Sequence, residues 1–371
     1  MKFNEFKLER FFAMYEFNVK HTISSSDCES MKAADLIALA GDDLKEAWYD
    51  LELGYTQSKG HPHLLDEISK LYKGIASEQI LAIVPQEGVL IALSSILQAG
   101  DHVIIMSPAY QSLKELPLSI GCDISNLPVC QQNGKWELDI DLLKALIKKE
   151  TKLLILNFPH NPTGYIPGID VFNEIVDIAR SAGIYILSDE MYRLSEYSAA
   201  DRLPPMAGIY EKGISLSGLS KTFGLPGLRS GWLVTRDEAL FKQFLQQKDY
   251  TTICGSAPGE ILSIMALQAR DAIIGRNMGI IRENIGHMES FLSRQGNSIG
   301  WIRPQAGPVA FGHQKNEMDA EQLSMKAISE KSLLILPGYV FDYEPSFFRL
   351  GLGRKGFKAG LDLLEELIGQ K

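Results

Sequence analysis

The stretch Ser217-Gly-Leu-Ser-Lys221-Thr-Phe-Gly-Leu-Pro-Gly-Leu-Arg229-Ser-Gly-Trp232 begins where an apolar run over residues 214–217 ends. We expect that run to form a strand and the glycine- and serine-rich residues after it to form a turn. A lysine in such a turn can be partly removed from water, which lowers its pKa and lets the neutral amine form a Schiff base. The planar guanidinium of Arg229 suits a phosphate dianion. The stretch therefore predicts a ligand site at the carboxyl end of a strand.

Short apolar runs alternate with amphipathic segments on both sides of this turn. The candidate strands are residues 80–84, 102–106, 153–157, 184–188, 214–217 and 231–235. The candidate helices between them are residues 87–97, 140–149 and 171–182. Unbroken apolar strands that alternate with helices predict an α/β fold with a mostly parallel central sheet, covered on both faces.

The pattern of predicted elements changes after residues 259–294, which we expect to form two or more long helical segments. Candidate strands 309–312, 333–336 and 347–351 then alternate with helices 320–330 and 357–368, which predicts a smaller α+β unit. We expect a large domain over residues 40–275. Residues 1–39 and 276–371 together form the expected small domain.

Composition and charge exclude several classes of protein. The 371 residues carry a formal net charge of −9, so a nucleic-acid partner has no basic surface to bind. No apolar stretch is long enough to span a membrane, and charges interrupt the first twenty residues, unlike a signal peptide. The four cysteines form no C-x-x-C pair, which favours a reduced, cytoplasmic setting.

Three further segments carry polar side chains directly after predicted strands. They are Asn157-Phe-Pro-His-Asn161-Pro-Thr-Gly164, Ser188-Asp189-Glu-Met-Tyr192 and Ser107-Pro-Ala-Tyr110. Taken singly, they are typical of a tight turn, a helix cap and a core tyrosine. Since parallel strands end at one edge of a sheet, we expect these side chains to meet there.

In this order, the motifs resemble those of the class I/II aminotransferases, which are pyridoxal 5′-phosphate (PLP) enzymes of fold type I. The resemblance implies that Lys221 holds PLP as a Schiff base and that Arg229 binds the cofactor phosphate. It places the Asp189 carboxylate against the pyridine nitrogen, where charge pairing keeps the ring protonated and a better electron sink. Asn161, which precedes an expected cis proline, and Tyr192 would share the cofactor's 3-oxygen.

The same resemblance implies further cofactor contacts. Tyr110 would stack on the pyridine ring. The amides of Gln86 and Glu87, at a helix N-terminus, and the hydroxyl of Ser220 would bind the phosphate. Two departures affect this cradle, because Val84-Pro85 stands where the family usually has Gly-Ala, and Gly218 stands where many members have serine.

Substrate contacts and a dimer also follow from the resemblance. In Phe348-Arg349-Leu-Gly, Arg349 matches the arginine that grips the substrate α-carboxylate with two hydrogen bonds. Asn161, Ser25 and Ser26 would line the substrate pocket. Tyr55, in Gly54-Tyr55-Thr-Gln-Ser-Lys-Gly60, matches a tyrosine that reaches the phosphate of the neighbouring subunit, so we expect a homodimer. The segment from Lys248 to Thr252 is expected near the same interface.

The expected reaction is transamination between small α-amino and α-keto acids, with Lys221, Asp189 and Tyr192 as the catalytic residues. An alternative is a PLP-dependent lyase or cyclase, because residues 20–27 lack the glycine-rich start usual in aminotransferases. Together with residues 157–164 and 248–252 they resemble the capreomycidine synthase branch. That branch eliminates water from a hydroxylated arginine and cyclises the product. A binding module like the aminotransferase-like half of some transcription regulators is a third alternative.

Two other patterns carry no function in our interpretation. Residues 351–356 match G-x-G-x-x-G but have no βαβ unit around them, so we do not expect a dinucleotide site. His61-Pro-His63 has no third ligand cluster nearby in the sequence, so we expect no metal.

Overall fold

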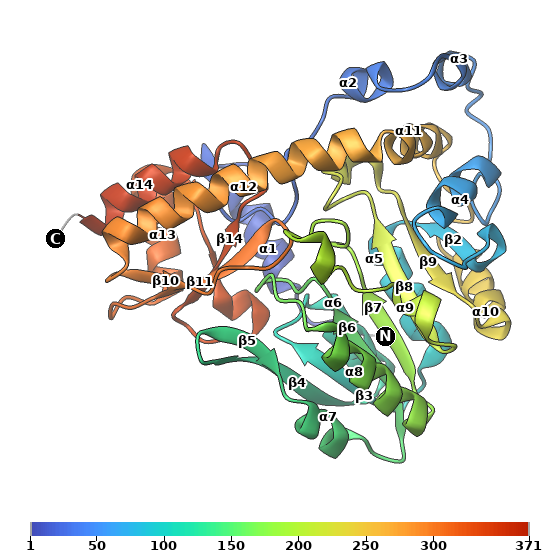
Figure 1. The fold of residues 1–371 in the computed structure, drawn as a ribbon, viewed down its shortest axis with the longest axis horizontal. Coiled ribbons are helices and arrows are strands. Elements are labelled where there is room, and N and C mark those ends of the chain that lie inside the picture. Colours follow the sequence, from blue (N-terminus) through green and yellow to red (C-terminus); the bar gives the residue numbers. More distant parts are fainter. Residues whose placement is uncertain (1, 370–371) are drawn as a thin grey trace.

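The computed structural model describes residues 2–369, and an eight-stranded mixed sheet lies at its centre (Figure 1). In spatial order the strands are β2 (Ile80–Ile83), β9 (Gly231–Thr235), β8 (Gly213–Gly218), β7 (Tyr185–Asp189), β6 (Thr151–Asn157), β3 (His102–Ser107), β4 (Asp123–Gln132) and β5 (Lys135–Leu138). Neighbours from β8 to β4 are parallel, whereas β9 and β5 run antiparallel to their neighbours. The predicted α/β class with a mostly parallel sheet is confirmed.

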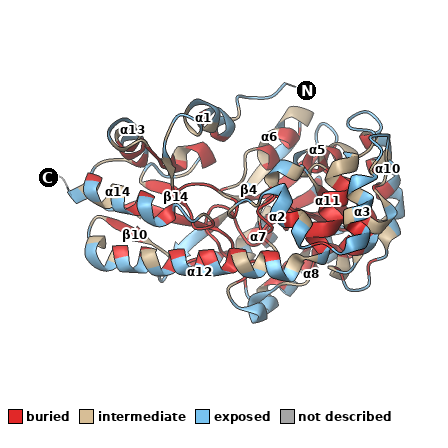
Figure 2. Ribbon diagram, turned by 90° about the horizontal axis from the view of Figure 1, so that it is seen from above, coloured by how far each residue is buried: buried red, intermediate tan, exposed pale blue. Residues whose placement is uncertain are grey.

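Alternate side chains of the central strands enter two separate cores. Val103 and Ile105 pack with helices on one face, while Ile104 and Met106 pack with helices on the other. The first face is covered by α5 (Pro85–Ile96), α6 (Ser112–Ile120) and α10 (Glu238–Lys248). The second is covered by α7 (Ile140–Leu146), α8 (Ile169–Ala182), α9 (Met206–Ile209), α4 (Pro62–Ser69) and α11 (Ala257–Gln268). Figure 2 shows α11 as largely buried.

Two strands of this sheet were not expected from the sequence. Half of the β4 residues are exposed, and β5 alternates exposed and buried side chains, so neither contains the continuous apolar run that marks the inner strands. The predicted helix over residues 140–149 ends earlier, at Leu146. Sequence patterns therefore identified the buried strands and missed the solvated edge.

A smaller antiparallel sheet lies toward the C-terminus, in the order β10 (Ile299–Trp301), β11 (Val309–Gln314), β14 (Phe347–Gly351) and β13 (Leu336–Pro337). It packs with α12 (Arg270–Gln295), α13 (Ala320–Lys331) and α14 (Phe357–Gly369). Helix α12 runs from α11 to this sheet (Figure 1). The predicted strand over residues 333–336 is wrong in one respect, because β12 (Leu333–Leu334) and β13 pair with different strands.

The N-terminal segment lies against both sheets. β1 (His21–Thr22) pairs with β12, and α1 (Lys7–Tyr15) buries Leu8 and Phe11. The short helices α2 (Ala33–Ala38) and α3 (Asp42–Tyr49) follow. The predicted boundary at residue 276 falls inside α12, and the division into two domains stays a prediction. Within residues 2–369, no helix is long and apolar enough to cross a membrane.

Candidate active site

A cavity of about 440 Å³ lies where β6, β7 and β8 end, between the central sheet, the N-terminal segment and β14. The structure brings most of the predicted site residues to its wall. These are Ser25, Ser26, Gln86, Tyr110, Asn161, Asp189, Tyr192, Ser220, Lys221, Arg229 and Arg349. Glu87 and Tyr55 are absent from this wall.

Lys221 enters the cavity directly after β8 and its turn. Its Nζ donates a hydrogen bond to Ser26 Oγ at 2.7 Å. Burial lowers the pKa of Lys221, and the nearby Arg349 adds to this effect, whereas Asp27 and Asp189 oppose it. A lysine with a lowered pKa has a larger fraction of neutral amine, which is the form that attacks a carbonyl carbon.

Asp189 is the last residue of β7 and presents its carboxyl group to the same cavity. Burial raises the pKa of Asp189 to about 6, and the Met191 amide and the Lys221 charge act in the opposite direction. The Met191 N–H donates to Asp189 Oδ1 at 3.1 Å. A cationic ligand beside this carboxyl group would stabilise its charged form.

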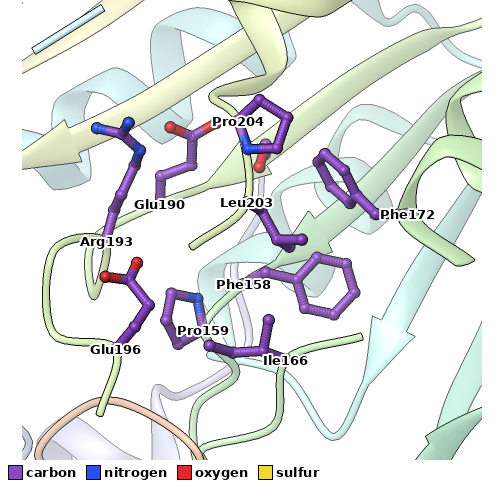
Figure 3. A pocket seen from close by; sticks show the side chains of 10 residues that line it. Phe158, Pro159, Ile166, Phe172, Glu190, Arg193, Glu196, Leu203 and Pro204 are labelled. Atoms are coloured by element: carbon purple, nitrogen blue, oxygen red, sulfur yellow. The ribbon is translucent and has the colours of Figure 1, made fainter. Parts of the chain in front are cut away.

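The next residue, Glu190, lies on the opposite side of the chain. Its Oε1 accepts hydrogen bonds from Ser215 Oγ at 2.6 Å and from the Met206 amide at 2.8 Å. Figure 3 shows Glu190 near Arg193 beside a small cavity of about 10 Å³. That volume holds about one water molecule, so the larger cavity is the candidate ligand site.

Arg349, on β14, is only 1 % exposed. Its Nε and Nη2 donate to the Ser24 carbonyl at 3.0 and 2.9 Å, and its Nη1 donates to Asn161 Oδ1 at 3.3 Å. Among the described residues, no carboxylate lies within ion-pair distance of this guanidinium. A buried cation with neutral partners alone is suited to bind an anionic ligand.

Three buried hydroxyl groups in the cavity wall have no hydrogen-bond partner within residues 2–369. They belong to Ser25, Tyr192 and Ser220. Burial raises the pKa of Tyr192, while Arg349 and the Ser26 hydroxyl lower it. Because buried polar groups are nearly always satisfied, these hydroxyls indicate a polar ligand.

Asn161 and Tyr110 face the cavity from loops after β6 and β3. The Asn161–Pro162 peptide is cis, as expected. The Asn161 amide N–H donates to Asn157 Oδ1 at 2.8 Å, which fixes the loop to the end of its strand. The Tyr110 hydroxyl donates to Glu9 of α1 at 2.7 Å, so its ring forms a side wall of the cavity.

The N-terminus of α5 contributes free amides. The first helical hydrogen bond runs from Gly88 N to Val84 O, so the amides of Gln86 and Glu87 have no acceptor within the helix. The Glu87 side chain turns away from the cavity, accepting hydrogen bonds from the Val84 amide and from Thr251 and Thr252. Glu87 therefore presents only its backbone to this end of the site.

The two departures from the family pattern lie against each other. A Cβ atom on Gly218 would lie 3.0 Å from Pro85 Cγ and 2.8 Å from the Ser230 carbonyl oxygen. A Cβ on Gly231 would lie 2.7 Å from Pro85 Cγ. Pro85 thus occupies part of the space that a side chain at position 218 would need. At this end of the cavity, Ser220 supplies a hydroxyl group instead.

Two predicted residues lie at the surface. Arg229 reaches the cavity wall, but its side chain is exposed and its φ of 49° lies in the left-handed region. Tyr55 is 93 % exposed and lies outside the cavity, in a shallow groove with Thr252 and Gly255. Tyr250 is exposed to a similar extent, at 91 %.

Several wall residues were missed by sequence reasoning. Helix α1 contributes Glu9, Phe12 and Glu16, and the loop after β14 contributes Arg354. The helix had a usable signal, because Leu8, Phe11, Phe12 and Tyr15 recur at the spacing of one helical face. Arg354 lies inside the discounted glycine pattern, and its guanidinium forms two 3.0 Å hydrogen bonds with Asp27.

Comparisons with known proteins identify the family of the chain. The family model for aminotransferase class I and II matches residues 45–356. Capreomycidine synthase from Streptomyces vinaceus is 27% identical over 285 residues, covering 76% of this chain and 72% of that protein.

Within residues 2–369, no group of three or more histidine, cysteine, aspartate or glutamate side chains could hold a metal ion.

Solved structures match the chain over its whole length. A PLP-dependent aminotransferase from Streptococcus suis has 30% identity and a TM-score of 0.94, covering 100% of this chain and 99% of that one. The PLP-dependent cyclase OrfR has 26% identity and a TM-score of 0.89, covering 100% and 98%. The chain therefore belongs to the class I and II aminotransferase family, whose cofactor is pyridoxal 5′-phosphate.

Proposed function

We propose that this enzyme moves an amino group between an α-amino acid and an α-keto acid, with PLP bound at Lys221. One observation carries the proposal. A lysine of lowered pKa, a carboxyl group of raised pKa and a buried arginine without a carboxylate partner line one cavity. Together they suit an aldehyde cofactor with a basic ring nitrogen and a substrate with an α-carboxylate.

The residues present fit PLP. The free amides at the start of α5, the Ser220 hydroxyl and Arg229 supply donors for a phosphate group. Asp189 supplies the negative charge for a pyridinium nitrogen, and Tyr192 and Asn161 supply hydrogen bonds for a ring oxygen. When bound, the cofactor supplies an electron sink for a bond broken at the substrate α-carbon.

The chain's own groups then position the substrate and move its proton. Arg349 holds the α-carboxylate with its planar fork, aided by Asn161. The Lys221 amine takes the α-proton as a general base and returns it as a general acid, a role that suits a lowered pKa. The N-terminal segment covers the cavity with Leu8, Phe12 and Ser26 and restricts the access of water.

A single turnover tests the proposal. Purified enzyme with bound PLP is mixed with single amino acids in the absence of a keto acid, and the cofactor absorbance and products are followed. We expect one amino acid to abolish the band of lysine-bound cofactor and to release about one equivalent of keto acid per site. Addition of a keto acid should restore the band. Release of ammonia or water with the band restored unaided would contradict transamination.

The second candidate function is a PLP-dependent elimination or cyclisation, and the acidic part of the cavity wall favours it. The carboxylates of Glu9 and Glu16 line the cavity, and Glu16 has no ion-pair partner among the described residues. Arg354 is already paired with Asp27. This wall suits a substrate with a cationic side chain, and relatives include capreomycidine synthase and a PLP-dependent cyclase. Testing basic amino acids in the same single-turnover experiment separates the two reactions by their products.

We further propose a homodimer in which Tyr55 contacts the cofactor phosphate of the partner subunit. The exposed Leu53 and Tyr55 line one shallow groove with Thr252. Tyr250 and Ile253, close to Thr252 in the sequence, are exposed too, and Arg229 is left open to solvent. A second copy would cover these apolar side chains. All four cysteines are free, which supports our expectation of a cytoplasmic enzyme.

A further inference from the structure

The segment Ser24 to Asp27 contacts both of the cations that the reaction needs. The Ser24 carbonyl oxygen accepts two hydrogen bonds from Arg349, and the Ser26 hydroxyl accepts one from Lys221 Nζ at 2.7 Å. Asp27 is the charge that most strongly favours the protonated form of Lys221. This short segment therefore connects the proposed carboxylate-binding arginine with the cofactor lysine.

The backbone on both sides holds this segment closely. The Gly351 amide donates to the Ile23 carbonyl at 2.6 Å, and the Cys28 amide donates to the Lys221 carbonyl at 3.3 Å. A Cβ atom on Gly351 would collide with the backbone of Ser25, so only glycine permits this approach. The Ser26 hydroxyl is thus held in place by its backbone at both ends.

We propose that Ser26 is a positioning residue that orients the Lys221 amine for proton transfer. This inference rests on the proposed function. A neutral amine has two N–H groups and one lone pair, and free rotation about the Cε–Nζ bond would spread that lone pair over many directions. Donation of one N–H to Ser26 restricts the rotation and leaves only two staggered directions for the lone pair.

The proposed step moves one proton from the substrate to Lys221. The substrate Cα–H bond breaks, its electron pair stays with the carbon, and a new N–H bond forms on Lys221. The resulting ammonium group can still donate a hydrogen bond to Ser26. The hydroxyl can therefore orient Lys221 both when it removes the proton and when it returns it. Tyr192 lines the same cavity as Ser26 and Lys221, so the three groups lie around one space.

The test compares Ser26→Ala with Ser26→Thr, which keeps a hydroxyl group, and with Thr22→Ala as a control. Thr22 lies in β1, just before this segment, and outside the cavity wall. We expect Ser26→Ala to lower kcat about 10- to 100-fold, the effect of losing one hydrogen bond to an ionisable group, with little change in KM. The isotope effect with an α-deuterated amino acid should rise, and Ser26→Thr should recover much of kcat.

A second measurement does not depend on turnover. The pH titration of the lysine-bound cofactor band and the rate at which cofactor-free protein takes up PLP should both change in Ser26→Ala and not in Thr22→Ala. An unchanged kcat and isotope effect, or a raised KM alone, would overturn the proposal. If the wild-type enzyme binds PLP but turns over no amino acid, the proposed function fails, while an unchanged titration in Ser26→Ala would overturn the Ser26 contact separately.

Discussion

The sheet-side wall of the cavity takes Asn161, Asp189 and Lys221 from the ends of three adjacent parallel strands or the loops directly after them, whereas the opposite wall takes Glu9 and Glu16 from helix α1 and its C-cap. The strand ends are fixed by ladders of backbone hydrogen bonds on both sides. Helix α1 is instead held by side-chain contacts, such as Tyr110 to Glu9 and Lys7 to Asp342. The first wall suits cofactor chemistry that tolerates no displacement, and the second suits substrate choice.

The largest effect should come from the sheet-side wall. Asp189→Asn keeps the shape of the side chain but removes its charge, and loss of one partner from a buried charge pair costs about 3–5 kcal/mol. We therefore expect kcat to fall by more than about 10²-fold. Glu190→Gln makes the same change one residue later, facing the small cavity, and should retain most of the activity. If kcat, measured at saturating PLP, falls equally in the two variants, the conclusion that only the larger cavity is the active site is wrong.

A smaller effect should come from Arg349, which joins the two walls through Asn161 and Ser24. Arg349→Lys keeps the charge and loses the planar fork. We expect kcat/KM for the amino acid to fall about 10- to 100-fold, mostly through KM, because two hydrogen bonds to a carboxylate cannot both form. Arg354→Lys should change KM much less, since Arg354 is paired with Asp27. Steady-state kinetics that show no change in KM for Arg349→Lys would exclude its proposed contact.

The smallest effect should come from Tyr55, which lies in neither wall of its own chain. Tyr55→Ala should weaken PLP binding about tenfold, the loss of one hydrogen bond to a charged group. Mixing this variant with Lys221→Ala should form hybrid dimers that contain one intact site, with normal PLP affinity. Activity at limiting PLP measures the recovery. A monomeric wild-type protein in light scattering, or no recovery in the mixture, would contradict the action of Tyr55 across an interface.

The same contrast explains what the sequence could predict. Asp189 and Asn161 follow unbroken apolar strands, and the ends of neighbouring parallel strands must lie together, so their meeting was foreseeable. Glu16 and Arg354 reach the cavity through the packing of α1 and the loop after β14, which leaves no spacing in the sequence. In the sequence, Pro85 and Gly218 were two unrelated differences from the family pattern. The structure shows that they lie against each other, and that contact depends on the position of α5 relative to β8 and β9.

The central claim is that Lys221 holds the cofactor, and chemical mapping tests it most directly. The enzyme with bound PLP is reduced with borohydride, digested, and examined by mass spectrometry for a phosphopyridoxyl-lysine. Lys248 offers an internal comparison, because burial lowers its pKa as it does that of Lys221, but it donates to the Ser58 and Ala82 carbonyls outside the cavity. We predict that the label is found on Lys221 alone. Label on Lys248 or another lysine, or no label after reconstitution with PLP, would contradict the account.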